Sequence, residues 1–254
     1  MPWHLVRWDQ AQSLALPPRS TDDERTEAFG LHSLQLAPAR SGTWIGARAH
    51  GASVNAYDAH FSIHSAGTHT ESAAHVSDLP LSIADVAPLE LLCACILECA
   101  PTRIGNDHVI TRERIEHAWQ QTTAWPKAFP PLRAAIVRTR DPDETPHRRW
   151  SNTHPPFFLP EALSFLVEQG IEHLICDLPS VDPEQDGGKL AAHRTFFALE
   201  DEGHARTQRT TITELAWIPA SIPSDLGLVR LDVLDWPTDA SPSRPVFYPL
   251  ILPP

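Results

Sequence analysis

The 254-residue sequence lacks the features that would take it into a membrane or onto nucleic acid. It contains no run of about 20 apolar residues, the length needed to cross a bilayer. No apolar segment of the secretory-signal kind follows Met1. Basic residues are few, because 20 Lys and Arg stand against 32 Asp and Glu and give a net charge of −12. That charge opposes binding to nucleic acid and to anionic membranes, so we expect a cytoplasmic protein with neither partner.

The sequence also lacks the usual signatures of thiol and serine chemistry. Its four cysteines include no C-x-x-C pair: Cys93 and Cys95 form a C-x-C, Cys99 follows, and Cys176 lies in a second apolar run. We expect these residues to be buried thiols in strands, since free Cys is among the most buried residue types. No G-x-S-x-G motif is present, so a serine nucleophile on such a turn is not expected.

No internal repeat, low-complexity tract or linker divides the chain, and its length suits one domain over residues 1–254. The 25 prolines predict many loops and interrupted strands. Residues 1–55 show little pattern, although the acids at 21–27 are typical of a helix N-terminus.

The rest of the chain alternates between strand and helix patterns. Continuous apolar runs predict buried strands, and amphipathic or proline-started segments predict helices. The predicted strands cover 88–98, 133–139, 171–177, 230–235 and 244–252, and the predicted helices cover 111–121 and 160–170. A polar loop is expected over 140–156, with His147 and His154 solvated. Strand–helix–strand units of this kind indicate an α/β fold.

Residues 60–75 concentrate metal-ligating side chains, with four histidines and Glu71. His69 and Glu71 are two apart, so both side chains leave the same face of an extended segment. His75 shares that parity and can return to the face after a short turn, whereas His64 needs a one-residue bulge at 65–66. Imidazole and carboxylate are ligands for zinc, manganese or iron. Ordinary surface histidines would give the same density, so the pattern alone leaves both interpretations open.

The segment resembles the signature of the cyclase family of metal-dependent hydrolases, which includes bacterial kynurenine formamidase. That signature reads His-x-Gly-Thr-His-x-Asp-x-Pro-x-His. Glu71 stands where it has Asp, Ala73 stands where it has Pro, and the first His comes one residue early, at His64. The positions that match in place are Gly67, Thr68, His69 and His75. The resemblance implies a metal site and a single domain of the swivelling β/β/α type.

A second motif follows the strand expected at 171–177. Asp177-Leu-Pro-Ser-Val-Asp-Pro183 is by itself only a turn pattern. It resembles a family segment, Pro-Ser-x-Asp, that leads through a Lys to a metal-binding His, and Lys189 and His193 follow at the corresponding places. The family's last ligand, a Glu two residues after an Ile, corresponds to Glu214.

The resemblance assigns roles to these residues. One or two divalent ions, zinc or manganese, are implied to be held by imidazoles and carboxylates. These ligands are His64, His69, Glu71, His193 and Glu214. Glu200 and Glu202 rank second for the last position because they lack the Ile context. His75 is implied to be the general acid/base, with binding of a second metal as the alternative role. Ser180 and Asp182 are expected to orient the site or the substrate.

The implied activity is hydrolysis of an amide C–N bond in a small molecule. N-formylkynurenine, which gives kynurenine and formate in tryptophan catabolism, is the first substrate to test. The alternatives are a cyclase or lactonase acting on another carbonyl substrate, and a fold that binds a small ligand without turnover. Family members commonly form homodimers or homotetramers, so an oligomer is expected. The N-terminal part of family members often contributes an aromatic side chain to the substrate pocket, but we expect Trp44 to be an ordinary packed aromatic.

Overall fold

The computed structural model describes residues 5–21, 25–122, 130–140, 148–199, 206–222 and 226–251. The strands are β1 (Leu5–Val6), β2 (Gln12–Ser13), β3 (Gln35–Pro38), β4 (Arg40–Ser41), β5 (Trp44–Ile45), β6 (Tyr57–His60), β7 (His69–Glu71), β8 (Leu92–Glu98), β9 (Thr102–Ile104), β10 (Asp107–Ile110), β11 (Ala134–Arg138), β12 (Phe157–Phe158), β13 (His173–Cys176), β14 (Thr211–Glu214), β15 (Leu226–Val233) and β16 (Ala240–Ile251). The helices are α1 (Ile63–Ala66), α2 (Ile83–Val86), α3 (Arg112–Thr122), α4 (Pro160–Glu168) and α5 (Ala191–Phe197). Turns of 3-10 helix lie at Trp8–Gln10, Arg48–His50, Ala73–Val76 and Thr207–Arg209.

A ring of strands forms the centre of the fold. Its order is β16–β15–β8–β11–β13–β14–β7, and β7 pairs again with β16, which closes the ring. The neighbours β8, β11, β13 and β14 run parallel, whereas β7, β15 and β16 pair antiparallel. The short strands β1 and β2 add to β16. The ring therefore brings the N-terminal motif on β7 against the C-terminal strand.

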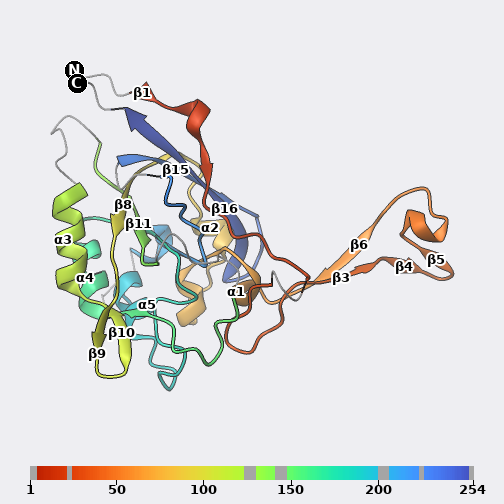
Figure 1. The fold of residues 1–254 in the computed structure, drawn as a ribbon, viewed down its shortest axis with the longest axis horizontal. Helices are drawn as coiled ribbons and strands as arrows, with labels where there is room; N and C mark the ends of the chain where they lie inside the picture. The colour runs from red at the N-terminus through yellow and green to blue at the C-terminus, as the bar shows by residue number, and fades with distance from the viewer. Residues whose placement is uncertain are drawn as a thin grey trace.

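Burial on both faces explains the continuous apolar runs of the parallel strands. On β8, Ala94 and Ile96 pack with Phe247 on one face, and Cys95 and Leu97 pack on the other. This second face is covered by α3, α4 and α5, which lie together at one side of the sheet (Figure 1). Strands that are buried on both faces lose the polar alternation of a half-exposed strand.

Most predicted elements are present. All five predicted strands and both predicted helices occur within a few residues of the expected bounds, and the α/β class is confirmed. The prediction of a helix that begins at 21–27 is wrong for residues 25–27, which are not helical; Glu27 forms an isolated bridge with Arg149. Residues 22–24 lie outside the described residues. In the described part of the chain, no helix is long and apolar enough to cross a membrane.

The cysteines match their expected environment. Cys95, Cys99 and Cys176 are buried, Cys93 is half-buried, and all four are free thiols. Burial raises the pKa of the Cys95 and Cys99 thiols to about 12. Thiolate, not thiol, binds metals and attacks electrophiles, so these residues serve packing.

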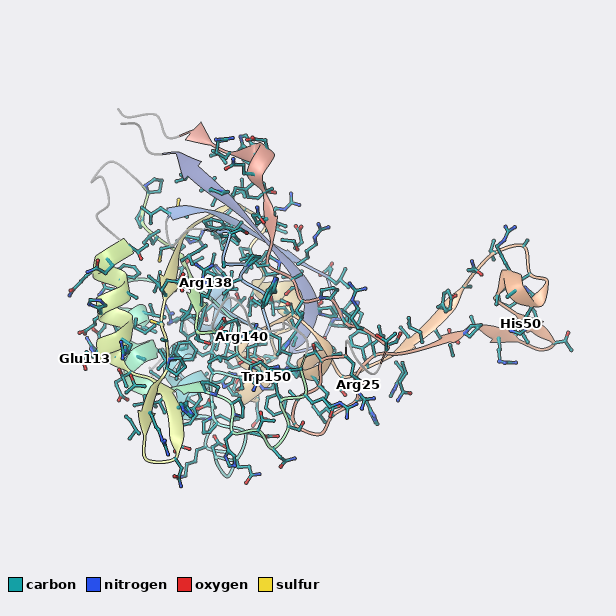
Figure 2. The ribbon with its side chains drawn as sticks, viewed as in Figure 1. Arg25, His50, Glu113, Arg138, Arg140 and Trp150 are labelled. Atoms are coloured by element: carbon teal, nitrogen blue, oxygen red, sulfur yellow. The ribbon has the colours of Figure 1, made fainter. Side chains whose placement is uncertain are left out.

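A long ribbon projects from the body of the molecule. It is built from the β3–β6 and β4–β5 pairs, and Figure 1 shows it extending well beyond the ring of strands. His50 lies at the far end of this ribbon and Arg25 near its base (Figure 2). We call residues 35–60 the arm. In the sequence, the arm lies between the N-terminal strands β1 and β2 and the metal-ligand residues that begin at His64.

Candidate metal centre

The ring closes at β7, and the Gly-Thr pair before this strand fixes its position. A Cβ on Gly67 would lie 2.5 Å from the carbonyl oxygen of Leu16, so the close approach of the two backbones requires glycine. Thr68 Oγ1 accepts a hydrogen bond from the Leu16 N–H at 2.7 Å and donates one to the Leu215 carbonyl. The pair thus ties β7 to the N-terminal segment and to the residue after Glu214.

Strand register brings His69, Glu71 and Glu214 together. His69 lies directly opposite Glu214 of β14, so both side chains leave the same face. Glu71 is two residues further along β7 and shares that face, as its spacing from His69 predicts. The three side chains are buried, and His69 Nε2 lies 3.5 Å from Glu214 Oε2.

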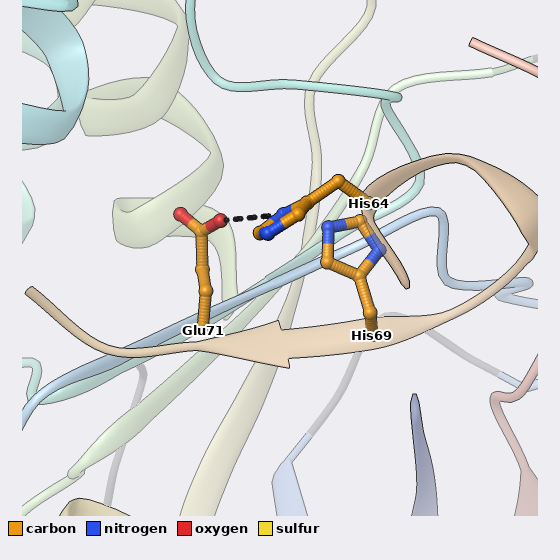
Figure 3. Close-up of side chains that lie close together, drawn as sticks. All are labelled: His64, His69 and Glu71. Carbon is orange, nitrogen blue, oxygen red and sulfur yellow. Dashed lines mark ion pairs between the residues drawn. The ribbon is translucent and has the colours of Figure 1, made fainter. Parts of the chain in front are cut away.

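His64 precedes β7 in the chain and His75 follows it, and both side chains reach Glu71. His64 lies in α1, so the predicted bulge at 65–66 is wrong, and a single helical turn directs its side chain instead. His64 Nδ1 lies 3.5 Å from Glu71 Oε2 (Figure 3). His75 follows on the 3-10 turn after β7, and its Nε2 lies 3.8 Å from the same oxygen. Both imidazoles therefore face one carboxylate.

His193 completes the cluster from α5. Its Nε2 lies 2.7 Å from Glu71 Oε1 and 3.5 Å from Glu214 Oε1. Asp182 accepts hydrogen bonds from the backbone N–H groups of Ala192 and His193, at 2.8 and 3.0 Å, and contacts His193 Nδ1 at 2.6 Å. Ser180 Oγ in turn accepts from the Asp182 N–H. The contacts of Asp182 thus hold His193, and the substrate-orienting role of Ser180 and Asp182 stays a prediction.

The inward-facing atoms of the cluster lack hydrogen-bond partners among the described residues. These atoms are His64 Nδ1, His69 Nε2, Glu71 Oε1 and Oε2, and His193 Nε2. Their contacts are ion pairs with one another, of which His193 Nε2 to Glu71 Oε1 is the shortest at 2.7 Å. Buried polar atoms without hydrogen bonds are costly, so their convergence indicates a ligand between them. Ligands about 2.0–2.2 Å from a zinc ion lie roughly 3–3.5 Å apart, and three of the contacts given above measure 3.5 Å. The residues therefore fit a divalent metal, in overlapping groups whose atoms lie within 4.8 Å of one another.

Each imidazole also has an oxygen partner on its outward nitrogen. His69 Nδ1 contacts the Gly67 carbonyl at 3.1 Å, and the carboxylate of Asp182 occupies the same position for His193. A partner of this kind fixes the ring orientation and the tautomer of a metal-ligating histidine. The outer contacts thus leave one nitrogen of each ring directed at the centre of the cluster.

The sequence did not reveal Asp239, which serves His64 and His75 in this way. Its Oδ2 lies 3.0 Å from His64 Nε2 and 2.9 Å from His75 Nδ1. Asp239 immediately precedes β16, and only the pairing of that strand with β7 brings it to the site. No local spacing relates it to the histidines, so no signal in the sequence could have identified it.

Neighbouring charges shift the pKa values within the cluster. Burial opposes a charge on His64, but Asp239 and Glu71 outweigh it and raise its pKa to about 10. Burial likewise disfavours the imidazolium of His193, yet Glu71, Asp182 and Glu214 raise its pKa well above the usual value. The pKa values of Glu71 and Glu214 are lowered despite burial, because imidazoles surround them. A divalent cation would replace the imidazole protons, so its binding is coupled to proton release.

A cavity of about 760 Å³ opens beside the cluster. His75 lies in its wall and also faces Glu71, so this residue joins the cavity to the metal ligands. The other lining residues are Ala74, Val76, Ser77, Asp78, Leu79, Arg194 and Leu199. A cleft of this size can hold a small molecule.

Other residues considered from the sequence lie away from the cluster. His60 is exposed at the end of β6, and His154 is exposed, as expected. Trp44 lies on the arm, where it is 41% exposed and the end of its ring lies 2.8 Å from the place that a Cβ on Gly46 would take. It is thus a partly packed aromatic outside the cluster. Three further candidates lie outside the described residues: His147, Glu200 and Glu202.

Comparison with known proteins identifies the family. A family model described as "Putative cyclase" matches residues 8–183, which include the first motif and the second as far as Pro183. The chain belongs to the cyclase family. No curated protein matches it. The family resemblance inferred from the sequence is therefore confirmed.

Solved structures of similar fold agree with membership of the cyclase family. A predicted metal-dependent hydrolase from Bacillus stearothermophilus is 15% identical with a TM-score of 0.63, covering 94% of this chain and 98% of that one. Isatin hydrolase A from Labrenzia aggregata is 16% identical with a TM-score of 0.63, and the match covers 96% of this chain and 94% of that one. A structure described as a novel cyclase is 13% identical with a TM-score of 0.65, and the match covers 96% of this chain and 89% of that one. At these identities the likeness concerns the fold, and it confirms the expected fold class.

Proposed function

We propose that the protein hydrolyses an amide C–N bond in a small molecule, with a divalent metal held by His64, His69, Glu71, His193 and Glu214. The observation that carries the proposal is the convergence of buried nitrogen and oxygen atoms, without hydrogen-bond partners in the described chain, where the ring of strands closes in a member of the cyclase family. Zinc or manganese, as one or two ions, would supply a Lewis acid for the carbonyl and make water nucleophilic at neutral pH. The chain supplies the ligands, the cavity and the proton carrier.

His75 is the general acid/base in this proposal. Its Nε2 faces the ligand cluster, and its ring also forms part of the cavity wall. A group in that position can take a proton from attacking water and deliver it to the leaving nitrogen. The side chain is 27% exposed, so protons can exchange with solvent between turnovers.

An aryl formamide such as N-formylkynurenine is the first substrate to test. The cavity joins apolar walls at Val76, Leu79 and Leu199 to polar groups at Ser77 and Asp78, which suits an aromatic amide with a polar side chain. The likeness to isatin hydrolases favours a second candidate, a cyclic amide such as isatin. A panel of an aryl formamide, isatin and a lactone separates amidohydrolase from cyclase or lactonase activity.

The first experiment measures the metal content of protein purified without chelator, together with His69→Ala. We expect one or two equivalents of zinc or manganese in the wild type and no stoichiometric metal in the variant, because His69 Nε2 is a buried ligand atom. His154→Ala, which removes an exposed histidine outside the cluster, is the matched control and should keep the metal.

The same preparations are then assayed with the substrate panel before and after chelation. Activity that chelator abolishes and zinc restores supports the metal-dependent hydrolase. A wild-type protein that contains no metal and takes up none when zinc or manganese is added contradicts it. In that case the fold would serve to bind a small ligand without turnover.

A further inference from the structure

One oxygen of Asp239 contacts two histidines of the metal centre at once. Oδ2 lies 3.0 Å from His64 Nε2 and 2.9 Å from His75 Nδ1, and the two rings are 4.3 Å apart between centroids. His69 and His193 each have an outer partner of their own. Asp239 is therefore the shared outer contact within the cluster.

The chemistry of a carboxylate decides which nitrogens carry protons. An ionised carboxylate oxygen only accepts hydrogen bonds, so His64 must donate from Nε2 and His75 from Nδ1. For the neutral rings, this leaves lone pairs on His64 Nδ1 and His75 Nε2. These two nitrogens are the atoms that face Glu71 Oε2, at 3.5 and 3.8 Å. One carboxylate thus selects opposite tautomers in the two rings and directs both lone pairs inward.

The strand pairing holds Asp239 in this position. Its carbonyl accepts hydrogen bonds from the Ser72 N–H at 2.8 Å and the Ser72 hydroxyl at 3.1 Å. The next residue, Ala240, lies opposite Glu71 in the β16–β7 ladder. The backbone of Asp239 is therefore fixed next to the strand that bears the ligands, which is what a precise contact to two side chains requires.

We propose that Asp239 is a positioning residue that orients His64 as a metal ligand and His75 as the acid/base, and so couples metal binding to proton transfer. This inference rests on the proposed function. Asp239 also lies with His64 and His75 in a group whose atoms could hold a metal ion. Positioning is favoured over ligation because one oxygen makes both contacts, at the ordinary N–H···O distances of 2.9 and 3.0 Å. In addition, the atoms of the cluster that lack hydrogen bonds to any described residue belong to His64, His69, Glu71 and His193.

The test compares zinc affinity, measured by competition with a chelator, in wild type, Asp239→Ala, Asp239→Asn and the control Asp232→Asn. Asp232 belongs to the preceding strand β15 and pairs with Arg230, away from the cluster. We expect Asp239→Ala to weaken zinc binding about 10–100-fold, the usual cost of losing an outer partner of a ligating histidine. Asp239→Asn keeps an acceptor oxygen and should lose less, and Asp232→Asn should bind zinc as the wild type does.

A His75→Ala background separates the two effects of Asp239. The zinc-affinity loss from Asp239→Ala should persist there, because it acts through His64. At saturating zinc, the loss in kcat on whichever panel substrate the wild type turns over should disappear in this background, because it acts through His75. In zinc-loaded wild type, ¹⁵N spectra of the imidazole rings should show His64 coordinated through Nδ1 with a protonated Nε2, and Asp239→Ala should lose the protected Nε2–H signal.

Unchanged zinc affinity in a folded Asp239→Ala variant overturns this inference and leaves the proposed function intact. Loss of one of two zinc equivalents also overturns it, because Asp239 would then be a ligand of a second ion. A wild type that binds no zinc or manganese overturns the proposed function and the positioning role together.

Discussion

His173 is a buried histidine outside the metal centre, and its surroundings keep it neutral. It lies on β13 with 1% of its surface exposed, and its Nδ1 contacts Thr211 Oγ1 at 3.0 Å. Its Nε2 has no hydrogen-bond partner among the described residues. Burial, followed by the nearby Arg133 cation, lowers its pKa to about 3. A proton on this ring would be strongly disfavoured in the folded chain.

The metal-free protein should therefore lose stability on acidification through His173. Between the unfolded pKa of 6.5 and the folded pKa of about 3, only the unfolded chain binds this proton, so the free energy of unfolding falls as the pH falls. The largest loss in the free energy of unfolding that this one group can cause is about 1.4 kcal/mol per pH unit, or roughly 2 kcal/mol between pH 6.5 and 5. In urea unfolding with chelator present, His173→Gln should lose less stability over this interval than the wild type. An equal loss in both proteins contradicts the prediction; His154→Gln, at an exposed site, is the control and should titrate like the wild type.

At the scale of elements, α5 depends on a carboxylate from outside the helix. The residue before it, Leu190, has a left-handed φ of 47° and provides no side-chain cap. Asp182 instead accepts from the N–H groups of Ala192 and His193 in the first turn. Carboxylates are favourable at helix N-termini, where backbone donors lack partners within the helix. The same carboxylate contacts His193 Nδ1, so Asp182 both caps the start of α5 and orients the ring of the proposed metal ligand.

Removal of the Asp182 carboxylate from the start of α5 should lower the stability of the protein even without metal. In Asp182→Ala, buried N–H groups lose their acceptor, and we expect the free energy of unfolding to fall by about 1–3 kcal/mol. Asp182→Asn keeps one acceptor oxygen and should lose less. Urea unfolding in the presence of chelator measures the helix contribution apart from metal binding. The exposed Asp235→Ala serves as control, and an Asp182→Ala stability within about 0.5 kcal/mol of wild type would contradict the role.

The same elements explain what the sequence could predict. Spacing of two residues was enough to place His69 and Glu71 on one face, because the strand period is local. The direction of His64 was not predictable in this way, since a helical turn replaced the expected bulge. Asp239 was missed because its position depends on β16 pairing with β7, a contact between distant segments. Local periodicity thus revealed the elements, whereas ring closure decided which distant side chains meet.

At the scale of the whole molecule, the arm carries an apolar face that no other part of the described chain covers. In the β3–β6 pair, Leu36 lies opposite Ala59 and Pro38 opposite Tyr57, so these side chains share one face of the ribbon. Leu36 and Tyr57 are 49% and 60% exposed. An isolated two-stranded ribbon is marginally stable in water, and an exposed apolar face marks an interaction surface. We propose that this face packs against a second copy in the homodimer or homotetramer expected for the family.

Charge placed on that face should therefore separate the copies. We expect wild type to have the mass of a dimer or tetramer by light scattering after size-exclusion chromatography, and Leu36→Glu/Tyr57→Glu to have the mass of a monomer. Two acids on each copy would be desolvated at the interface and, in a chain of net charge −12, would add to repulsion between copies. Leu89→Glu is the matched control, because Leu89 is 96% exposed and lies outside the arm, and it should leave the mass unchanged. Zinc affinity should persist in the double variant, since the cluster consists of residues outside β3 and β6. A double variant that keeps the wild-type mass, or a wild type that is monomeric, would contradict the proposed interface.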